Sequence, residues 1–366
     1  MTRRRSILGA SALAGAATLA RPALAQSLPS VRWRIASAYP KTLDTIYGGG
    51  VYIAQQVEAA TGGKFQISVH GAGELVPANQ VIDAVANGTV EAGHTATSFA
   101  FGKDPTFAFG SAMPFGPTTR QQAAWMYYGD GLKLMREFMR PYGITTFPAG
   151  NTTAQMGGFY RKEIRTVQDF KGLRFRVAGI AGMVLAKLGV IPQQIAPGEI
   201  YQSLEKGTID AAEFVGPHDD EKLGLGKVAR YYYTPGFWEG SAQVDLVVNL
   251  KAWEALPREY QAALSTACTA ASQDMVAKYD AQNMAAMKRM LASGVELRAF
   301  SNEIMLAAHK AALELYQEIA AKNANFDKVY RSWSRFHEDQ IGWFALVENR
   351  YENFMAQLSR AKPHKA

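Results

Sequence analysis

Residues 88–94 read Gly-Thr-Val-Glu-Ala-Gly-His, and residues 207–213, which lie 119 positions later, read Gly-Thr-Ile-Asp-Ala-Ala-Glu. Each stretch follows a short helical pattern, over residues 80–86 and 200–206, and its glycine stands where a left-handed residue ends a helix. The residues after the glycine predict a strand, and the carboxyl ends of such strands face the crevice where open α/β sheets bind ligands. The repeated pattern therefore predicts two similar α/β lobes.

Strand and helix patterns alternate on both sides of these stretches. Residues 32–36 and 65–69 alternate polar and apolar side chains, as half-buried strands do, and residues 45–60 between them have helical spacing. Helices that alternate with short strands predict a largely parallel, doubly wound sheet. Residues 173–177 predict a strand of the second lobe, whereas the small residues of 151–158 are compatible with a strand that crosses between the lobes.

The last third of the sequence is mainly helical. Residues 244–250 predict a buried strand that returns the chain, a long helix begins at Leu256-Pro257, and residues 295–300 predict one more strand. An aromatic-rich helical pattern then runs from Trp333 to Leu358. Its apolar stripe can pack within its own lobe or against a second copy of the chain, so a homodimer through this segment stays open. The stripe consists of Trp343, Phe344, Val347, Tyr351, Phe354 and Leu358.

The first 25 residues differ in character from the rest. Arg3-Arg4-Arg5 is followed by an uncharged run over 6–20 and by small residues at Ala23 and Ala25, which is typical of a secretory signal. The run is shorter than the roughly 20 residues that span a bilayer. Paired arginines favour the twin-arginine route, although the Sec route also accepts a basic start. We therefore expect residues 1–25 to be removed and the mature protein to be periplasmic.

Charge and cysteine content limit the classes of partner and bond. Residues 1–25 hold four arginines and no acidic residue, so the remaining chain carries a formal charge of +3 instead of +7. Without a dense Lys/Arg cluster the sequence disfavours nucleic acid, and it is compatible with a small anionic ligand. Cys268 is the single cysteine and lies in an Ala-rich helical stretch, which predicts a buried, inert thiol and no intramolecular disulfide.

Signatures of common enzyme classes are missing. There is no phosphate-binding loop, Gly-x-Ser-x-Gly elbow, His-Glu-x-x-His pair or Gly-x-Gly-x-x-Gly fingerprint. Residues 218–221, His-Asp-Asp-Glu, form a dense group of potential metal ligands, but adjacent residues rarely converge on one ion, so we interpret them as a solvated acidic loop.

Arg174 and Arg176 are two positions apart on the predicted strand 173–177, so their side chains point to the same side. One of them can therefore sit deep, where its planar guanidinium matches the geometry of a carboxylate. From the pattern alone, two exposed arginines remain the alternative.

Several blocks in chain order resemble the solute-binding subunits of tripartite ATP-independent periplasmic (TRAP) transporters, closest to the branch associated with 2-oxo acids such as pyruvate. The resemblance implies a two-lobed α/β periplasmic binding protein of the Venus-flytrap type with a long C-terminal helical segment. It also implies a receptor, not an enzyme, that delivers its ligand to membrane subunits for import driven by an ion gradient. The blocks are residues 31–37, 103–110, 150–158, 171–176, 207–213 and 238–240.

We expect the lobes to be formed by separate stretches of the chain. The first lobe takes residues 27–151 with about 243–283, and the second takes residues 152–242 with about 284–330. Residues 331–366 form the C-terminal helix.

The resemblance also implies roles for individual residues. The arginine that binds the substrate carboxylate in this family matches Arg176. A cation beside the ligand is held in the oxo-acid branch by residues that match Gln155, Glu213 with Phe214, and Glu239. All supply oxygen atoms, which suit sodium or calcium. The alternative is that Glu213 and Glu239 are only solvated acids at strand ends.

Two departures from the family pattern concern the pocket. Phe214 stands where close relatives tend to have tryptophan, and Ser98-Phe99-Ala100-Phe101 replaces a tyrosine-rich run. The carbonyl of Phe214 can still bind a cation, but fewer side-chain donors predict a less polar pocket and an oxo acid with a larger apolar side chain. Phe101 either forms a wall of this pocket or packs in the core.

Two other functions stay open. The first is a receptor of the same class for a hydroxy acid such as lactate, held with calcium. The second is a periplasmic enzyme that uses Glu213 and Glu239 as an acid and base pair.

Overall fold

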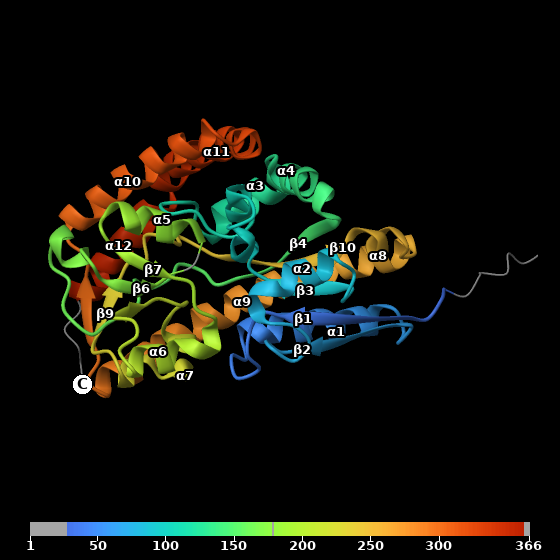
Figure 1. Ribbon diagram of the computed structural model, residues 1–366, viewed down its shortest axis with the longest axis horizontal. Coiled ribbons are helices and arrows are strands. Elements are labelled where there is room, and N and C mark those ends of the chain that lie inside the picture. The colour runs from blue at the N-terminus through green and yellow to red at the C-terminus, as the bar shows by residue number, and fades with distance from the viewer. Residues whose placement is uncertain (1–27, 178, 362–366) are drawn as a thin grey trace, which may run out of the picture.

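Two separate β-sheets organise the chain (Figure 1). The computed structural model describes residues 28–177 and 179–361, so the predicted signal over residues 1–25 lies outside the described part. The first sheet has the strand order β2-β1-β3-β10-β4, and the second has the order β11-β9-β5-β8-β6-β7. Each sheet with its helices forms one lobe, and the lobes lie at opposite ends of the molecule in Figure 1.

One strand in each sheet runs against the others. In the first sheet β1 is parallel to β2 and β3, whereas β10 is antiparallel to both β3 and β4. In the second sheet β5 is antiparallel to β8 and β9, and the other pairs are parallel. The largely parallel sheets that the sequence predicts are confirmed. The strands of the first lobe are β1 (Val31–Ser37), β2 (Phe65–His70), β3 (Ala92–Thr95), β4 (Ile144–Asn151) and β10 (Gln243–Asn249).

The strands of the second lobe are short, with two to four residues each. They are β5 (Phe159–Tyr160), β6 (Arg174–Arg176), β7 (Ile191–Gln193), β8 (Ala211–Ala212), β9 (Tyr231–Thr234) and β11 (Glu296–Ala299). This distribution of strands is compatible with the predicted lobes, whose boundaries stay a prediction.

The repeated stretches end helices as predicted. Gly88 and Gly207 have φ of +74° and +69°, and they follow α2 (Val81–Ala86) and α6 (Ile200–Glu205). A left-handed residue is easiest for glycine, which has no Cβ. The strands that follow are shorter than expected, because each repeated stretch first makes a turn. Strand pairing starts only at Ala92 in the first stretch and at Ala211 in the second.

The chain passes between the lobes through two irregular segments that lie side by side. Segment 152–158 joins β4 to β5, and segment 235–242 joins β9 to β10. We call them the crossing segments. Backbone bonds tie them together: Thr152 N donates to Ala242 O over 2.9 Å, and Gln155 N donates to Glu239 O over 3.2 Å. The expectation of a strand over 151–158 is wrong beyond Asn151, because this stretch bonds to the other crossing segment only at separate points.

Helix α9 (Arg258–Ala292) is the third connection and packs on both lobes (Figure 1). It contacts α1 (Ile46–Ala60) in the first lobe and α7 (Pro217–Leu223) in the second. Its apolar stripe is buried, and Cys268 is buried beside it, as predicted. The stripe comprises Tyr260, Leu264, Ala267, Ala271, Met275 and Tyr279.

The C-terminal helices pack first on the second lobe and then on the first lobe. Helix α10 (Asn302–Ala320) is capped by Ser301, whose side chain accepts a hydrogen bond from Ile304 N, and packs on α5 (Gly179–Lys187). Helix α11 (Ala324–Leu346) then returns to the first lobe, where it contacts α3 (Thr119–Tyr128), α4 (Gly131–Met139) and the short turn 105–110. The helix begins before the predicted start at residue 331 and ends at Leu346, and α12 (Glu348–Ala361) follows it. A short helix, α8 (Leu250–Glu254), precedes α9.

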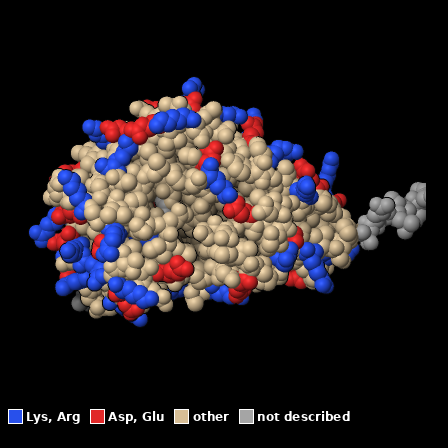
Figure 2. Space-filling view, in the orientation of Figure 1, with Lys and Arg blue, Asp and Glu red and all other residues tan. Residues whose placement is uncertain are grey.

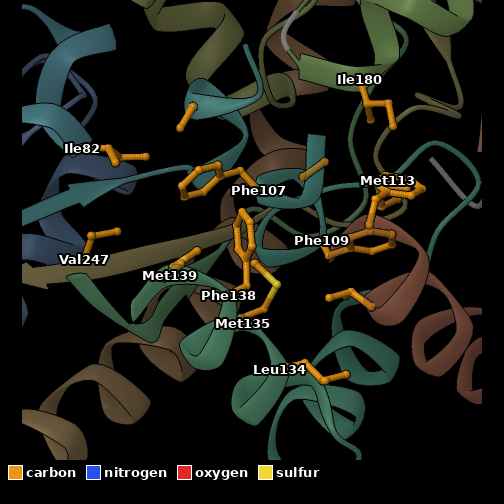
Figure 3. Close-up of a cluster of buried hydrophobic side chains, with 14 of the residues drawn as sticks. Ile82, Phe107, Phe109, Met113, Leu134, Met135, Phe138, Met139, Ile180 and Val247 are labelled. Atoms are coloured by element: carbon orange, nitrogen blue, oxygen red, sulfur yellow. The ribbon is translucent and has the colours of Figure 1, made fainter. Parts of the chain in front are cut away.

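The largest buried cluster joins the two lobes through side chains. Phe107, Phe109 and Phe138 of the first lobe pack with Met135, and Ile180 of α5 belongs to the same cluster (Figure 3). Because interiors are close-packed, this shared core fixes how α5 sits against the first lobe.

The visible face carries acidic and basic side chains that are interspersed, with no continuous basic stripe (Figure 2). Within the part of the chain that the structure describes, no helix has the length and apolar character of a membrane span.

Candidate ligand and cation site

A small cavity lies where the two lobes and the crossing segments meet. Its volume is about 40 Å³, and we call it the inner cavity. The first lobe contributes eight residues, and the rest of the lining comes from the second lobe and the crossing segments. The first-lobe residues are Tyr39, Ile46, Ala96, Ser98, Phe99, Ser111, Gln243 and Val244. The polar members of that second group are Thr152, Gln155, Arg176, Glu213 and Glu239.

Arg176 occupies the deep position on β6. It is 3 % exposed, and its Nη1 donates to both the carbonyl oxygen and Oε1 of Glu213, each over 2.6 Å. Its Nε donates to Ile195 O over 3.2 Å, and its guanidinium lies over the ring of Phe214 at 5.7 Å. No residue that the structure describes accepts a hydrogen bond from its Nη2. The deep arginine of the sequence prediction is therefore Arg176.

Arg174 lies at the outer end of the same strand. It is half-buried and forms an ion pair with Asp210 over 2.6 Å. The register explains the different depth, because Arg176 pairs with Ala212 at the inner end of β8, and Arg174 precedes that pairing.

Glu213 and Phe214 follow β8 directly, so the strand end carries them into the cavity. Glu213 is 1 % exposed, and its backbone N–H donates to Arg176 O. The alternative that Glu213 is a solvated acid at a strand end is wrong.

Gln155 and Glu239 come from the paired crossing segments. Gln155 Nε2 donates to Thr152 Oγ1 over 2.8 Å, which leaves Oε1 buried with no hydrogen-bond partner among the described residues. Glu239 keeps some accessible surface, but this surface faces the inner cavity and a second cavity behind it. Burial raises the pKa of Glu239 well above its ordinary value, the charge of Glu213 raises it further, and Arg176 acts in the opposite direction.

The donor set fits a hard cation. Two carboxylates lie close enough to repel each other, and the unpartnered amide oxygen of Gln155 faces the same space. Hard cations take such oxygen ligands, and a positive ion would offset the repulsion. Residues 28–177 and 179–361 hold no group of three or more His, Cys, Asp or Glu that could bind a metal. A cation here would therefore depend on amide and backbone oxygens beside Glu213 and Glu239.

The aromatic wall differs from the expectation. Phe101 is partly buried against the first-lobe core and is not among the residues that line the inner cavity, whereas Phe99 is. Tyr39 also lines it and was not predicted. Its signal in the sequence is its place just after β1, at the carboxyl end of a parallel strand.

Residues 218–221 are not a solvated loop. They belong to α7, and His218, Asp219 and Asp220 are buried there. Asp220 accepts a hydrogen bond from Tyr232, and Asp219 accepts one from Tyr279 of α9. Their role is to fasten α7 to its neighbours.

Comparison with known proteins identifies the family of the chain. Residues 36–323 match the family of bacterial extracellular solute-binding proteins, family 7 (DctP). The chain belongs to this family.

Relatives extend the match over nearly the whole chain. A monocarboxylate 2-oxoacid-binding periplasmic protein of Nostoc sp. (strain PCC 7120) is 45% identical over 359 residues, which cover 96% of this chain and 98% of that protein. A TRAP transporter solute-binding protein from Bordetella bronchiseptica, with copurified calcium and picolinate, is 49% identical with a TM-score of 0.90 and covers 91% of this chain and 100% of its own. One from Pseudoalteromonas atlantica with sodium and pyruvate is 36% identical, with a TM-score of 0.85 and coverage of 88% and 99%.

Membership of solute-binding family 7 defines the class of protein. The two-lobed binding-protein fold with its long helix is confirmed. The chain is an extracytoplasmic transport receptor and not an enzyme, so the acid and base pair of Glu213 and Glu239 is set aside.

Proposed function

We propose that this receptor binds a small monocarboxylate 2-oxo acid together with sodium or calcium between its lobes and delivers it to the membrane subunits of a TRAP transporter. The observation that carries the proposal is the convergence of Arg176 with Glu213, Glu239 and Gln155 on one cavity. Arg176 supplies the carboxylate contact, and the other three supply the oxygens for the cation.

The chemistry of the relatives' ligands supports a bidentate grip on the cation. Picolinate is bound with calcium in the Bordetella bronchiseptica protein, and pyruvate with sodium in the Pseudoalteromonas atlantica protein. Both ligands place a carboxylate oxygen beside a second electron-pair donor, the ring nitrogen or the 2-oxo group. A cation can bind both donors at once, so a 2-oxo acid fits a site that holds a cation next to an arginine.

Arg176 already pairs with Glu213, and this pair explains how the site keeps its charges balanced. With Arg176 and both acids ionised, the cluster carries one net negative charge. Calcium with a monoanionic ligand adds one positive charge and compensates it, whereas sodium with the same ligand leaves it unchanged. In this proposal Arg176 Nη2 binds the ligand carboxylate, while Nη1 keeps its hydrogen bonds to Glu213.

The test is isothermal titration of the mature chain with pyruvate, lactate and malonate, each with sodium alone, with calcium, and after chelation. We expect pyruvate to bind most tightly and to lose affinity at least tenfold when the effective cation is removed. Tighter binding of lactate with calcium would replace the 2-oxo acid by a hydroxy acid, and cation-independent binding would contradict the cation site.

We further propose that the exposed face of α11 and α12 mediates a homodimer. Trp343, Val347, Tyr351 and Phe354 are 43–67 % exposed on successive turns, and large apolar patches usually mark interfaces. Light scattering on the mature chain should give the mass of two copies, and removal of residues 348–366 should give one. A monomer at micromolar concentration would contradict this proposal.

A further inference from the structure

Another cavity, larger than the inner cavity and separate from the one behind Glu239, lies on the side of Arg176. It has a volume of about 600 Å³, and Arg176 and Phe99 line both spaces. Its walls face each other across the lobes: residues 72–79 of the first lobe and residues 194–199 of the second. We call it the vestibule.

The vestibule is apolar where it faces the lobe gap. Leu75 is 38 % exposed into solvent, and Val76 and Ile195 are partly exposed beside it. When a ligand covers such exposed apolar side chains, their removal from water stabilises the complex. The apolar lining residues are Pro40, Ala72, Leu75, Val76, Pro77, Ala78, Phe99, Ile195, Ala196 and Pro197.

Arg176 fixes where a ligand would enter the vestibule. Its Nη1 bonds to Glu213 in the inner cavity, whereas its Nε bonds to Ile195 O in the vestibule wall. A carboxylate held by this guanidinium therefore lies at the boundary between the two spaces. Because the inner cavity is small and would also hold the cation, carbon atoms beyond the oxo group extend into the vestibule.

Charge in the vestibule disfavours a second carboxylate. Among the described residues that line it, Arg176 is the one cationic side chain, and it is already engaged by Glu213. Glu199 at the rim adds a negative charge, and the remaining polar side chains, Asn79 and Gln194, are neutral.

We infer that the vestibule is a subsite for the side chain of the ligand, and that the receptor prefers 2-oxo monocarboxylates with a branched aliphatic tail over pyruvate and over 2-oxo dicarboxylates. This inference rests on the proposed function and specifies its substrate class. Each methylene that becomes buried adds about fourfold in affinity. A tail with three more carbon atoms than pyruvate is thus expected to bind on the order of tenfold more tightly, after losses from ordering the tail.

The test compares 4-methyl-2-oxopentanoate, pyruvate and 2-oxoglutarate by titration against the mature wild-type chain and two variants. Leu75→Asn removes apolar surface from the vestibule. Leu291→Asn is its matched control, because Leu291 is 40 % exposed at the end of α9 and lies outside the vestibule. We expect Leu75→Asn to weaken binding of the branched acid at least fivefold and of pyruvate less than twofold, and Leu291→Asn to leave both unchanged.

The outcomes separate this inference from the function on which it rests. If pyruvate binds and the branched acid gains nothing, or if Leu75→Asn affects both acids equally, the side-chain subsite is wrong and the receptor function stands. Binding of 2-oxoglutarate as tight as that of the branched acid overturns the selectivity. If none of the three acids binds to folded wild-type protein, the 2-oxo acid function itself fails.

Discussion

Arg176 serves the empty protein as well as the ligand. The side chains of Arg176 and Glu213 are 4 % and 2 % exposed, so their ion pair is buried. Removing one partner of a buried pair leaves an uncompensated charge and costs about 3–5 kcal/mol.

We therefore expect Arg176→Ala to abolish binding of the acid and also to lower the melting temperature of the empty protein. Arg176→Lys, which keeps the charge but loses the fork of donors, should retain most of the stability and lose most of the affinity. Titration and thermal unfolding measure the two effects. An empty Arg176→Ala protein that melts like wild type would show that the pair with Glu213 contributes little.

The raised pKa of Glu239 leads us to expect that cation binding depends on pH. Because burial and the neighbouring Glu213 raise the pKa of Glu239, this side chain stays protonated in the empty protein at a pH where glutamate is normally ionised. Between the ordinary pKa of glutamate and the raised one, the folded state binds more protons than the unfolded state, so the stability of the empty protein falls as pH rises.

A cation binds the ionised carboxylate, so it must displace this proton, and we expect cation affinity to rise with pH over the same window. Titrations in two buffers of different ionisation enthalpy should show proton release. Glu239→Gln should weaken cation binding and remove the release. Release that persists in Glu239→Gln would assign the proton to another group.

At this scale the sequence predicted the residue types better than their surroundings. Arg176 could be placed on one side of a strand from the spacing, but its depth depends on register with β8, which spacing does not give. Phe99 and Phe101 are indistinguishable in the sequence, and only the short turn over residues 97–100 decides which of them lines the cavity.

At the scale of elements, the glycines of the repeated stretches carry a specific conformation. A residue with a Cβ pays about 1–2 kcal/mol in the left-handed region. At Gly88 a Cβ would meet only Asn249 Nδ2 at 3.8 Å, so the effect of a substitution there reports backbone conformation and not crowding.

Gly88→Ala should therefore lower the free energy of unfolding by about 1–2 kcal/mol. Gly48→Ala is the control, because Gly48 lies within α1, has nothing within 4 Å of its Cβ position and should gain stability from better helix propensity. Urea unfolding of both variants measures the difference. Equal stability of the two variants would contradict the role of the left-handed turn.

An element could be predicted from the sequence when its own local pattern determines it, and could not when contacts with distant residues shape it. Helix α9 was predictable because its stripe repeats over many turns. The crossing segments were not, because each is shaped by hydrogen bonds to the other across a long stretch of sequence, such as Gln155 N to Glu239 O. The start of α11 was also missed, although its signal is local: the Asn323 side chain caps the helix by accepting a hydrogen bond from Phe326 N.

At the scale of the whole molecule, charged side chains join the two lobes at the surface. Asp44 lies in the first lobe just before α1, and it forms ion pairs with Lys222 of α7 and with Lys278 of α9. Partial burial acts in the opposite direction, but these two lysines hold the pKa of Asp44 below its ordinary value. The contact therefore persists at neutral pH and is lost only in strong acid, as pH falls through the lowered pKa.

We expect Asp44→Asn to weaken ligand binding less than tenfold, because an exposed ion pair contributes little and its partners keep other contacts. The effect should shrink at high salt, where surface charges are screened. Titrations at low and high ionic strength measure both. A loss that does not depend on salt would show that Asp44 acts through something other than these pairs.

The position of Gln155 and Glu239 on the crossing segments gives the site a mechanical asymmetry. When two lobes rotate about a hinge, atoms close to the hinge move less than atoms far from it. The crossing segments connect the two lobes, whereas the walls of the vestibule belong to the lobes themselves, one wall to each lobe. When the lobes open, Gln155 and Glu239 would therefore move little and keep their contacts with the cation. The acid would lose its contacts with the lobes first, so we expect the organic anion to dissociate before the metal ion.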